Sequence, residues 1–150
     1  MRNEYPKISI VTVVYNGEET IEETILSVKN LSYSNVEYII IDGGSTDETL
    51  NIIKKYEDKI DYWISEKDNG IYDAMNKGIK KATSEFVIFM NGGDTFFDEN
   101  VLANIEKDLT NDFDIYYGDN YKVKENGAKR LKSAVTLKKV SPVYQYLLKS

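Results

Sequence analysis

The sequence predicts an α/β fold, a mostly parallel sheet with helices on both faces, from three observations. Short apolar runs rich in β-branched residues recur along the chain between glycine, proline or asparagine, which is typical of buried strands. The segments between them carry apolar residues three and four positions apart, which indicates amphipathic helices. The chain has 150 residues, 41% of them hydrophobic, enough for one domain with a core. Strands and helices alternating at this length favour parallel pairing.

The first half of the chain is predicted to form two strand-helix units. Residues 8–14 are an apolar run bounded by Pro6 and by Asn16-Gly17, and they read as a buried strand. Asn16 or Gly17 is expected to cap a helix whose inner face carries Ile21, Ile25, Val28 and Leu31. Residues 36–41 are the second strand. Residues 45–48 have the form of a capping box that opens a helix with Leu50, Ile53 and Tyr56 facing inward.

The second half continues the alternation and then weakens. Strands are expected at residues 60–64, 86–90 and 114–117, with a helix at 71–82 after the first of them. Asp98 is expected to cap the next helix, which carries Val101, Leu102, Ile105 and Leu109. Beyond Gly118 we expect a hairpin at residues 121–131 around Asn126-Gly127 and the start of a helix at residues 143–148.

Composition excludes several classes of function. The net charge of -6 argues against nucleic acid as a partner. The chain has no cysteine and no histidine, so any metal must be a hard cation held by oxygen atoms. No run approaches the roughly 20 apolar residues of a membrane span, and a cytoplasmic location is expected. The locally basic C-terminal third leaves open peripheral contact with the inner face of the membrane.

Three carboxylates follow successive predicted strands and lie close to glycine. Ligands of open parallel sheets bind beyond the carboxyl ends of the strands, and Asp42, Asp68 and Asp94 fall at or just past such ends. Taken singly, each is best explained as a cap or turn residue, because aspartate is common there. Taken together, they favour a site for an anion and a metal ion. The dinucleotide and P-loop glycine motifs are absent, so another kind of nucleotide site is required.

Four motifs give the sequence a family resemblance. Residues 8–16, 41–47, 70–78 and 91–94 read ISIVTVVYN, IDGGSTD, GIYDAMNKG and NGGD. In order and spacing, from about residue 8 to residue 119, they resemble the family 2 glycosyltransferases of the GT-A fold. The resemblance implies transfer of a sugar from a nucleotide-diphosphate donor, with inversion at the anomeric carbon. It also implies a divalent cation, Mg²⁺ or Mn²⁺, bound to the diphosphate.

The resemblance also implies roles for individual residues. The nucleoside pocket would be lined by Val14, Tyr15 and Asn16, with Asp42 hydrogen-bonded to the base or ribose. The other wall of the nucleotide-sugar site would be formed by Asp68, Asn69, Gly70 and Asn76, with Gly93 beside the diphosphate. Asp94 is the expected ligand of the cation, which stabilises the charge that develops on the leaving nucleoside diphosphate.

The sequence departs from the family at two places, and one function is unassigned. Asn91 and Gly93 occupy the places of an Asp-x-Asp motif, which leaves Asp94 as the only carboxylate in that turn. Met75 stands where many relatives have arginine. Lys77 could replace that contact, although a solvated lysine is the simpler interpretation. The catalytic base is expected beyond Ser150, and the candidate within the chain is Asp119.

One domain is expected over residues 1–150, with a nucleotide-sugar-binding half at about 7–119 and the start of an incomplete acceptor half at about 120–150. The expected partners are a nucleotide-diphosphate sugar, with a UDP-sugar favoured, and a glycan or lipid-linked acceptor. Tyrosines of the C-terminal part, such as Tyr121, could stack on sugars or simply pack in the sheet and at an interface. A truncated, non-catalytic nucleotide-sugar-binding module is the alternative. A nucleotidyltransferase would need a glycine-rich basic loop after the first strand, and residues 12–17 contain no basic residue.

Overall fold

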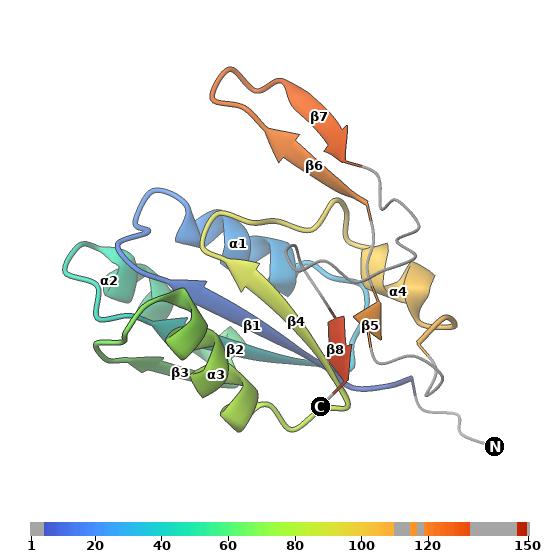
Figure 1. The fold of residues 1–150 in the computed structure, drawn as a ribbon, viewed down its shortest axis with the longest axis horizontal. Helices are drawn as coiled ribbons and strands as arrows, with labels where there is room; N and C mark the ends of the chain where they lie inside the picture. Colours follow the sequence, from blue (N-terminus) through green and yellow to red (C-terminus); the bar gives the residue numbers. More distant parts are fainter. Residues whose placement is uncertain (1–4, 110–114, 117–118, 133–146, 150) are drawn as a thin grey trace.

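A six-stranded sheet forms the centre of the computed structural model, which describes residues 5–109, 115–116, 119–132 and 147–149. The strand order is β3-β2-β1-β4-β8-β5, and the first four strands are parallel (Figure 1). β8 runs antiparallel between β4 and β5. The strands are β1 (Ile8–Val14), β2 (Val36–Asp42), β3 (Tyr62–Ser65), β4 (Phe86–Asn91), β5 (Ile115–Tyr116) and β8 (Leu147–Lys149). The predicted mostly parallel sheet is confirmed.

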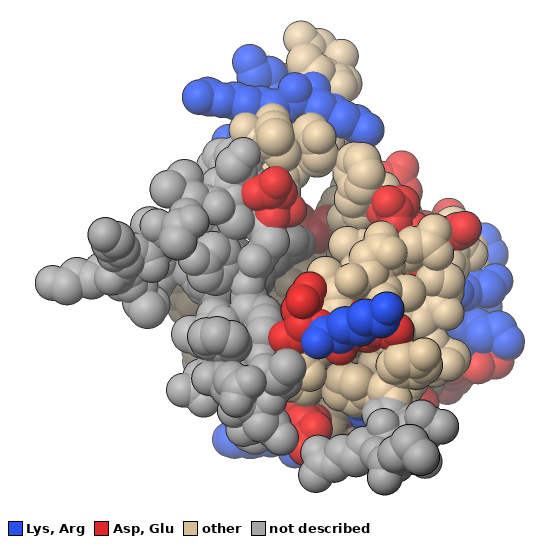
Figure 2. All heavy atoms as spheres, turned by 90° about the vertical axis from the view of Figure 1, so that its right-hand side faces the viewer, with Lys and Arg blue, Asp and Glu red and all other residues tan. Residues whose placement is uncertain are grey.

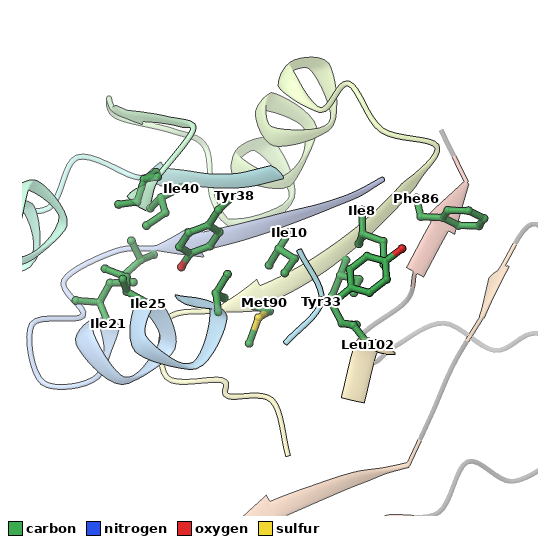
Figure 3. Packing of buried hydrophobic residues seen from close by; sticks show 14 of the residues in the cluster. Ile8, Ile10, Ile21, Ile25, Tyr33, Tyr38, Ile40, Phe86, Met90 and Leu102 are labelled. Carbon is green, nitrogen blue, oxygen red and sulfur yellow. The ribbon is translucent and has the colours of Figure 1, made fainter. Parts of the chain in front are cut away.

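Helices cover both faces of this sheet, as predicted. α1 (Ile21–Lys29), α2 (Thr49–Lys55) and α4 (Val101–Ile105) pack on one face, where Ile25, Ile53 and Leu102 join strand residues such as Ile10 and Ile40 (Figure 3). α3 (Ile71–Lys81) covers the other face through Ala74. A short 3-10 helix, η1 (Glu57–Lys59), follows α2. Among the described residues, every helix is too short or too polar to cross a bilayer.

The first two helices each begin several residues later than predicted. α1 begins at Ile21 with Thr20 as its N-cap, because Gly17 forms a turn in which its carbonyl accepts the N–H groups of Thr20 and Ile21. α2 begins at Thr49 rather than after Ser45. The predicted capping box does not form, because the Ser45 hydroxyl is hydrogen-bonded elsewhere.

The C-terminal part confirms one prediction and corrects two. A hairpin of β6 (Asn120–Val123) and β7 (Lys129–Lys132) forms, and Gly127 in its turn has a φ of 77°. The predicted helix is wrong at Leu147–Lys149, which is strand β8, while residues 143–146, 114 and 117 lie outside the described residues. The N-cap of α4 is Asn100, whose N–H donates to the predicted cap, Asp98, at 2.8 Å.

A buried carboxylate ties the strands together at the amino end of the sheet. Glu37 on β2 accepts hydrogen bonds from the hydroxyls of Ser9 and Thr83, the Thr83 N–H and the Lys7 ammonium. Burial alone would raise the pKa of this carboxyl, but the hydrogen bonds from Ser9, Thr83 and Lys7 lower it to about 2. Glu37 therefore remains charged and holds β1, β2 and the end of α3 at the edge opposite the strand carboxyl ends.

Candidate functional site

The carboxyl ends of four parallel strands lie level with one another. The register pairs Val14 with Asp42, and Asp42 with Ser65, across β1, β2 and β3. The loops that follow β2 and β4 are both hydrogen-bonded to the end of β1. Gly43 N–H donates to the Val14 carbonyl at 2.9 Å, and Gly92 N–H donates to the Val13 carbonyl at 2.9 Å. The structure thus brings the predicted strand-end motifs to one edge of the sheet.

Asp42 lies at the centre of this edge but is fully buried, with 0% of its surface exposed. One carboxylate oxygen accepts from Gly44 N–H at 3.0 Å, Ser45 N–H at 2.9 Å and the Ser65 hydroxyl at 2.6 Å. The other accepts from the Ser45 hydroxyl at 2.5 Å. A carboxylate has about four acceptor positions. Asp42 therefore accepts four hydrogen bonds from β3 and the loop between β2 and α2, and it has no exposed surface for a ligand.

The three residues at the end of β1 differ in their contacts with the rest of the protein and in their exposure. Val14 is 8% exposed and packs into the core. Asn16, at a positive φ of 48°, uses its side-chain oxygen to accept the Thr46 N–H at 2.9 Å, and its own N–H donates to Ser45 at 2.7 Å. Tyr15, at 65% exposed, presents its ring to solvent, and Asn16 is exposed as well.

Asp68 takes the space above β2 that the missing side chain of Gly43 leaves open. A Cβ atom on Gly43 would lie 2.7 Å from Asp68 Oδ2, closer than such atoms approach in proteins. Asp68 Oδ1 accepts the Gly70 N–H at 2.9 Å, which fixes the carboxylate in a turn, and Asp68 itself is half-buried. No donor from the described residues is recorded on Oδ2. This oxygen is an acceptor available to a ligand.

Lys77 of α3 holds the loop that carries Asp68. Its ammonium lies 2.9 Å from a Glu66 carboxylate oxygen and 3.6 Å from one of Asp73. The hydrogen bond to Glu66 raises the Lys77 pKa above its usual value. The expected wall residues Asn69, Gly70 and Asn76 are all exposed beside this loop. Lys77 is thus engaged with the protein's own carboxylates, which favours a role in fixing the loop.

Asp94 closes the tight turn after β4. Its Oδ2 accepts the Asn91 N–H at 2.9 Å and the Asn91 side-chain amide at 3.2 Å, while its own N–H donates to the Asn91 carbonyl at 2.9 Å. Gly93 has a φ of 105° and is bonded through its N–H to Thr24 on α1. The other Asp94 oxygen carries no recorded donor from the described part of the chain.

The residues of this turn fit a hard divalent cation with one protein carboxylate. Among the described residues, no three Asp, Glu, His or Cys side chains are placed so that they could together hold a metal ion. Mg²⁺ commonly binds through one or two carboxylates, with substrate phosphates and water as the other ligands. The free oxygen of Asp94 matches that donor set.

Sequence reasoning missed Phe97 and Ser65. Phe97 stacks on Tyr121 of β6 at a centroid distance of 5.5 Å and an interplanar angle of 19°. The signal was present in the adjacent pair Phe96-Phe97 after the Asp94 turn, where one ring is partly buried and the other exposed. Ser65 gave no signal, because its partner is distant in the sequence. Asp119, the candidate base, is exposed directly before β6.

Comparisons with known proteins agree with this arrangement. An uncharacterized glycosyltransferase of Mycobacterium tuberculosis is 35% identical over 106 residues, 70% of this chain and 40% of the relative. One of Haemophilus influenzae is 32% identical over 138 residues, 90% of this chain and 55% of the relative. The crystal structure of S. aureus TarS 1-349 in complex with UDP-GlcNAc matches with a TM-score of 0.63 and 26% identity. That match covers 73% of this chain and 33% of TarS 1-349.

The family model described as glycosyl transferase family 2 matches residues 9–148, nearly the whole chain. The chain spans about half the length, or less, of the curated relatives reported above. The parallel sheet, the strand-end carboxylates and these matches lead to one conclusion: the chain belongs to the family 2 glycosyltransferases.

Proposed function

We propose that this chain binds a nucleotide-diphosphate sugar at the strand-end edge and that the whole protein transfers the sugar, with inversion, to a glycan or lipid-linked acceptor. The observation that carries the proposal is the pair of half-buried carboxylates, Asp68 and Asp94, each fixed in a turn with one oxygen left for a ligand. The related TarS was crystallised with UDP-GlcNAc, which supports a nucleotide sugar as the ligand class.

In this proposal Asp68 contacts the nucleobase and Asp42 acts as a positioning residue. Asp42 is buried and bonded to its own loop and to Ser65 of β3, whereas Asp68 Oδ2 lies beside Gly43 at the end of β2 and can accept a hydrogen bond from a ligand. An ionised carboxylate accepts but does not donate. It therefore suits a base with a ring N–H, such as uracil, thymine or guanine, over cytosine, whose ring nitrogen is an acceptor. The exposed ring of Tyr15 covers the base from the β1 side.

Asp94 holds the divalent cation at the diphosphate. When bound, the cation supplies Lewis-acid stabilisation of the charge that develops on the leaving nucleoside diphosphate. Asn91 keeps the Asp94 carboxylate oriented through two hydrogen bonds, and Gly93 lets the turn lie close to α1. Inversion also requires a base that takes the proton of the acceptor hydroxyl. We propose a carboxylate beyond Ser150 for this step, with Asp119 as the candidate within the chain.

Calorimetric titration with nucleotides tests the donor site. We expect the wild type to bind UDP in the presence of Mn²⁺ or Mg²⁺ and to bind CDP more weakly. Asp68→Asn should weaken UDP binding by about tenfold or more, the usual effect of losing a hydrogen bond to a charged group. It should also reduce the difference in affinity between UDP and CDP. Asp94→Ala should remove the dependence on the cation.

Asp58→Asn is the matched control, because it makes the same chemical change on an exposed carboxylate of η1. It should bind UDP like the wild type. Wild type that binds none of UDP, TDP or GDP with either cation would refute the donor site. UDP binding that survives Asp68→Asn unchanged would refute only the assignment of the base contact. Binding without sugar transfer by the full-length protein would favour the non-catalytic alternative.

A further inference from the structure

Two stacked aromatic rings stand in solvent beside the proposed reaction centre. Phe97 is 72% exposed and Tyr121 is 44% exposed, yet their rings lie almost parallel, 5.5 Å apart. Large apolar side chains that gather on a surface commonly mark a binding site. We call this pair the aromatic platform.

The platform is close to the Asp94 turn and is held there. Phe97 follows Asp94 by three residues, so their Cα atoms are at most about 10 Å apart. The segment between them is anchored to α1, because Gly93 N–H donates to the Thr24 hydroxyl at 2.8 Å and Phe96 N–H donates to the Ser27 hydroxyl at 2.7 Å. The backbone that carries Phe97 is therefore held within this distance of Asp94, the residue assigned to the cation.

The two faces of the hairpin that supplies Tyr121 carry different side chains. Pairing sets Tyr121 opposite Leu131, while the neighbouring pair is Lys122 and Arg130. Because side chains alternate between the faces of a strand, the two pairs lie on opposite faces. Figure 2 shows the Lys and Arg side chains gathered on this projecting hairpin at the top of the view. Lys129 pairs with Val123 and so lies on the same face as Tyr121, which places one cation on the side of the aromatic platform.

We propose that the aromatic platform is a subsite for a sugar ring of the acceptor, and that Lys129 on the same face favours an acceptor that carries phosphate or carboxylate groups. A flat aromatic face packs against the C–H face of a pyranose while the sugar hydroxyls remain in water. The open position of the platform suits such a half-exposed ligand, and its place beside Asp94 brings the acceptor to the donor sugar. This inference rests on the proposed function, because the acceptor has meaning only beside a donor.

Saturation-transfer difference NMR on the chain tests the subsite directly. The probes are the methyl β-glycosides of glucose, galactose and N-acetylglucosamine, with irradiation of the protein's aromatic protons. We expect at least one glycoside to receive saturation from the wild type. Phe97→Ala should weaken that glycoside's binding by about tenfold, the scale of one aromatic contact. Phe97→Tyr, which keeps the ring, should retain it.

Tyr5→Ala is the control, because Tyr5 is also exposed, at 60%, but precedes β1 at the opposite end of the sheet. Absence of saturation on all three glycosides, or a signal that survives Phe97→Ala, would overturn the proposal. Cosedimentation with phosphatidylglycerol vesicles that is lost in Phe97→Ala, without glycoside contact, would also overturn it and mark a membrane surface. UDP titration of the same variants keeps the two proposals apart: a lost glycoside signal with intact UDP binding concerns the acceptor subsite alone.

Discussion

Replacing Glu37 by glutamine should destabilise the protein in a pH-dependent way. The pKa of Glu37 falls from its ordinary value of 4.5 to about 2 in the folded protein. At about 1.4 kcal/mol for each pKa unit, the ionised form contributes about 3 kcal/mol to the free energy of unfolding at pH 7. The side chain is only 12% exposed, so solvent screening reduces this figure little.

The sign follows from the lowered pKa. The stabilisation is present above pH 4.5, where Glu37 is ionised in both states, and it is lost as the pH falls toward 2. At pH 3 about 1.5 kcal/mol of it should remain, because the folded protein still binds fewer protons than the unfolded chain. The difference between wild type and Glu37→Gln should therefore shrink by about half between pH 7 and pH 3.

Urea denaturation of both proteins at several pH values measures this difference. Glu57→Gln, which makes the same chemical change on an exposed glutamate of η1, is the control and should show a small difference from wild type. A gap between wild type and Glu37→Gln that stays constant from pH 7 to pH 3 would refute the reasoning. It would mean that shape and packing, rather than charge, determine the role of Glu37.

Three further substitutions test close contacts around the sheet. Gly78→Ala would place a Cβ atom 2.3 Å from Val11 Cγ1. The clash should lower the free energy of unfolding by about 1–3 kcal/mol, offset by the ~1 kcal/mol by which alanine stabilises a helix relative to glycine. A variant that is more stable than wild type in urea denaturation would contradict the close approach of Gly78 to Val11. Gly43→Ala should displace the Asp68 carboxylate and weaken UDP binding, measured by calorimetry, about as much as Asp68→Asn does. Unchanged affinity would argue against a position of Asp68 directly beside Gly43. Ser65→Ala should weaken UDP binding by about threefold to tenfold, because it removes a hydrogen bond to the Asp42 carboxylate that positions the loop. Equal affinity would show that this hydrogen bond is not needed.

The parallel core was predictable because each strand is a local pattern. β1 agrees with its predicted limits, and the alternating runs that follow it fix the order of the elements. β8 was missed for the opposite reason. A three-residue segment holding Leu147 and Leu148 looks the same in a helix or a strand, and its pairing with β4 depends on residues about 60 positions away.

The location of the candidate site at the strand ends was predictable, but the hydrogen bonding of its side chains was not. Asp42 and Asp68 look alike in the sequence, each a carboxylate near glycine at a strand end. Only the packing shows that Ser45 and Ser65 saturate Asp42, whereas Asp68 keeps one oxygen free. Hydrogen bonds between loops depend on strand register, and the register cannot be predicted from any one segment of the sequence.

The position of β8 has a consequence for how the sheet can be completed during synthesis. β4 is made from residues 86–91, but the strand that pairs with its outer side comes from Leu147–Lys149. Until those residues leave the ribosome, β4 presents an open row of backbone donors and acceptors, which is a template for pairing with another chain. β5 also depends on β8 for its place in the sheet. The nascent chain should therefore be most prone to aggregation, and most dependent on chaperones, during this interval.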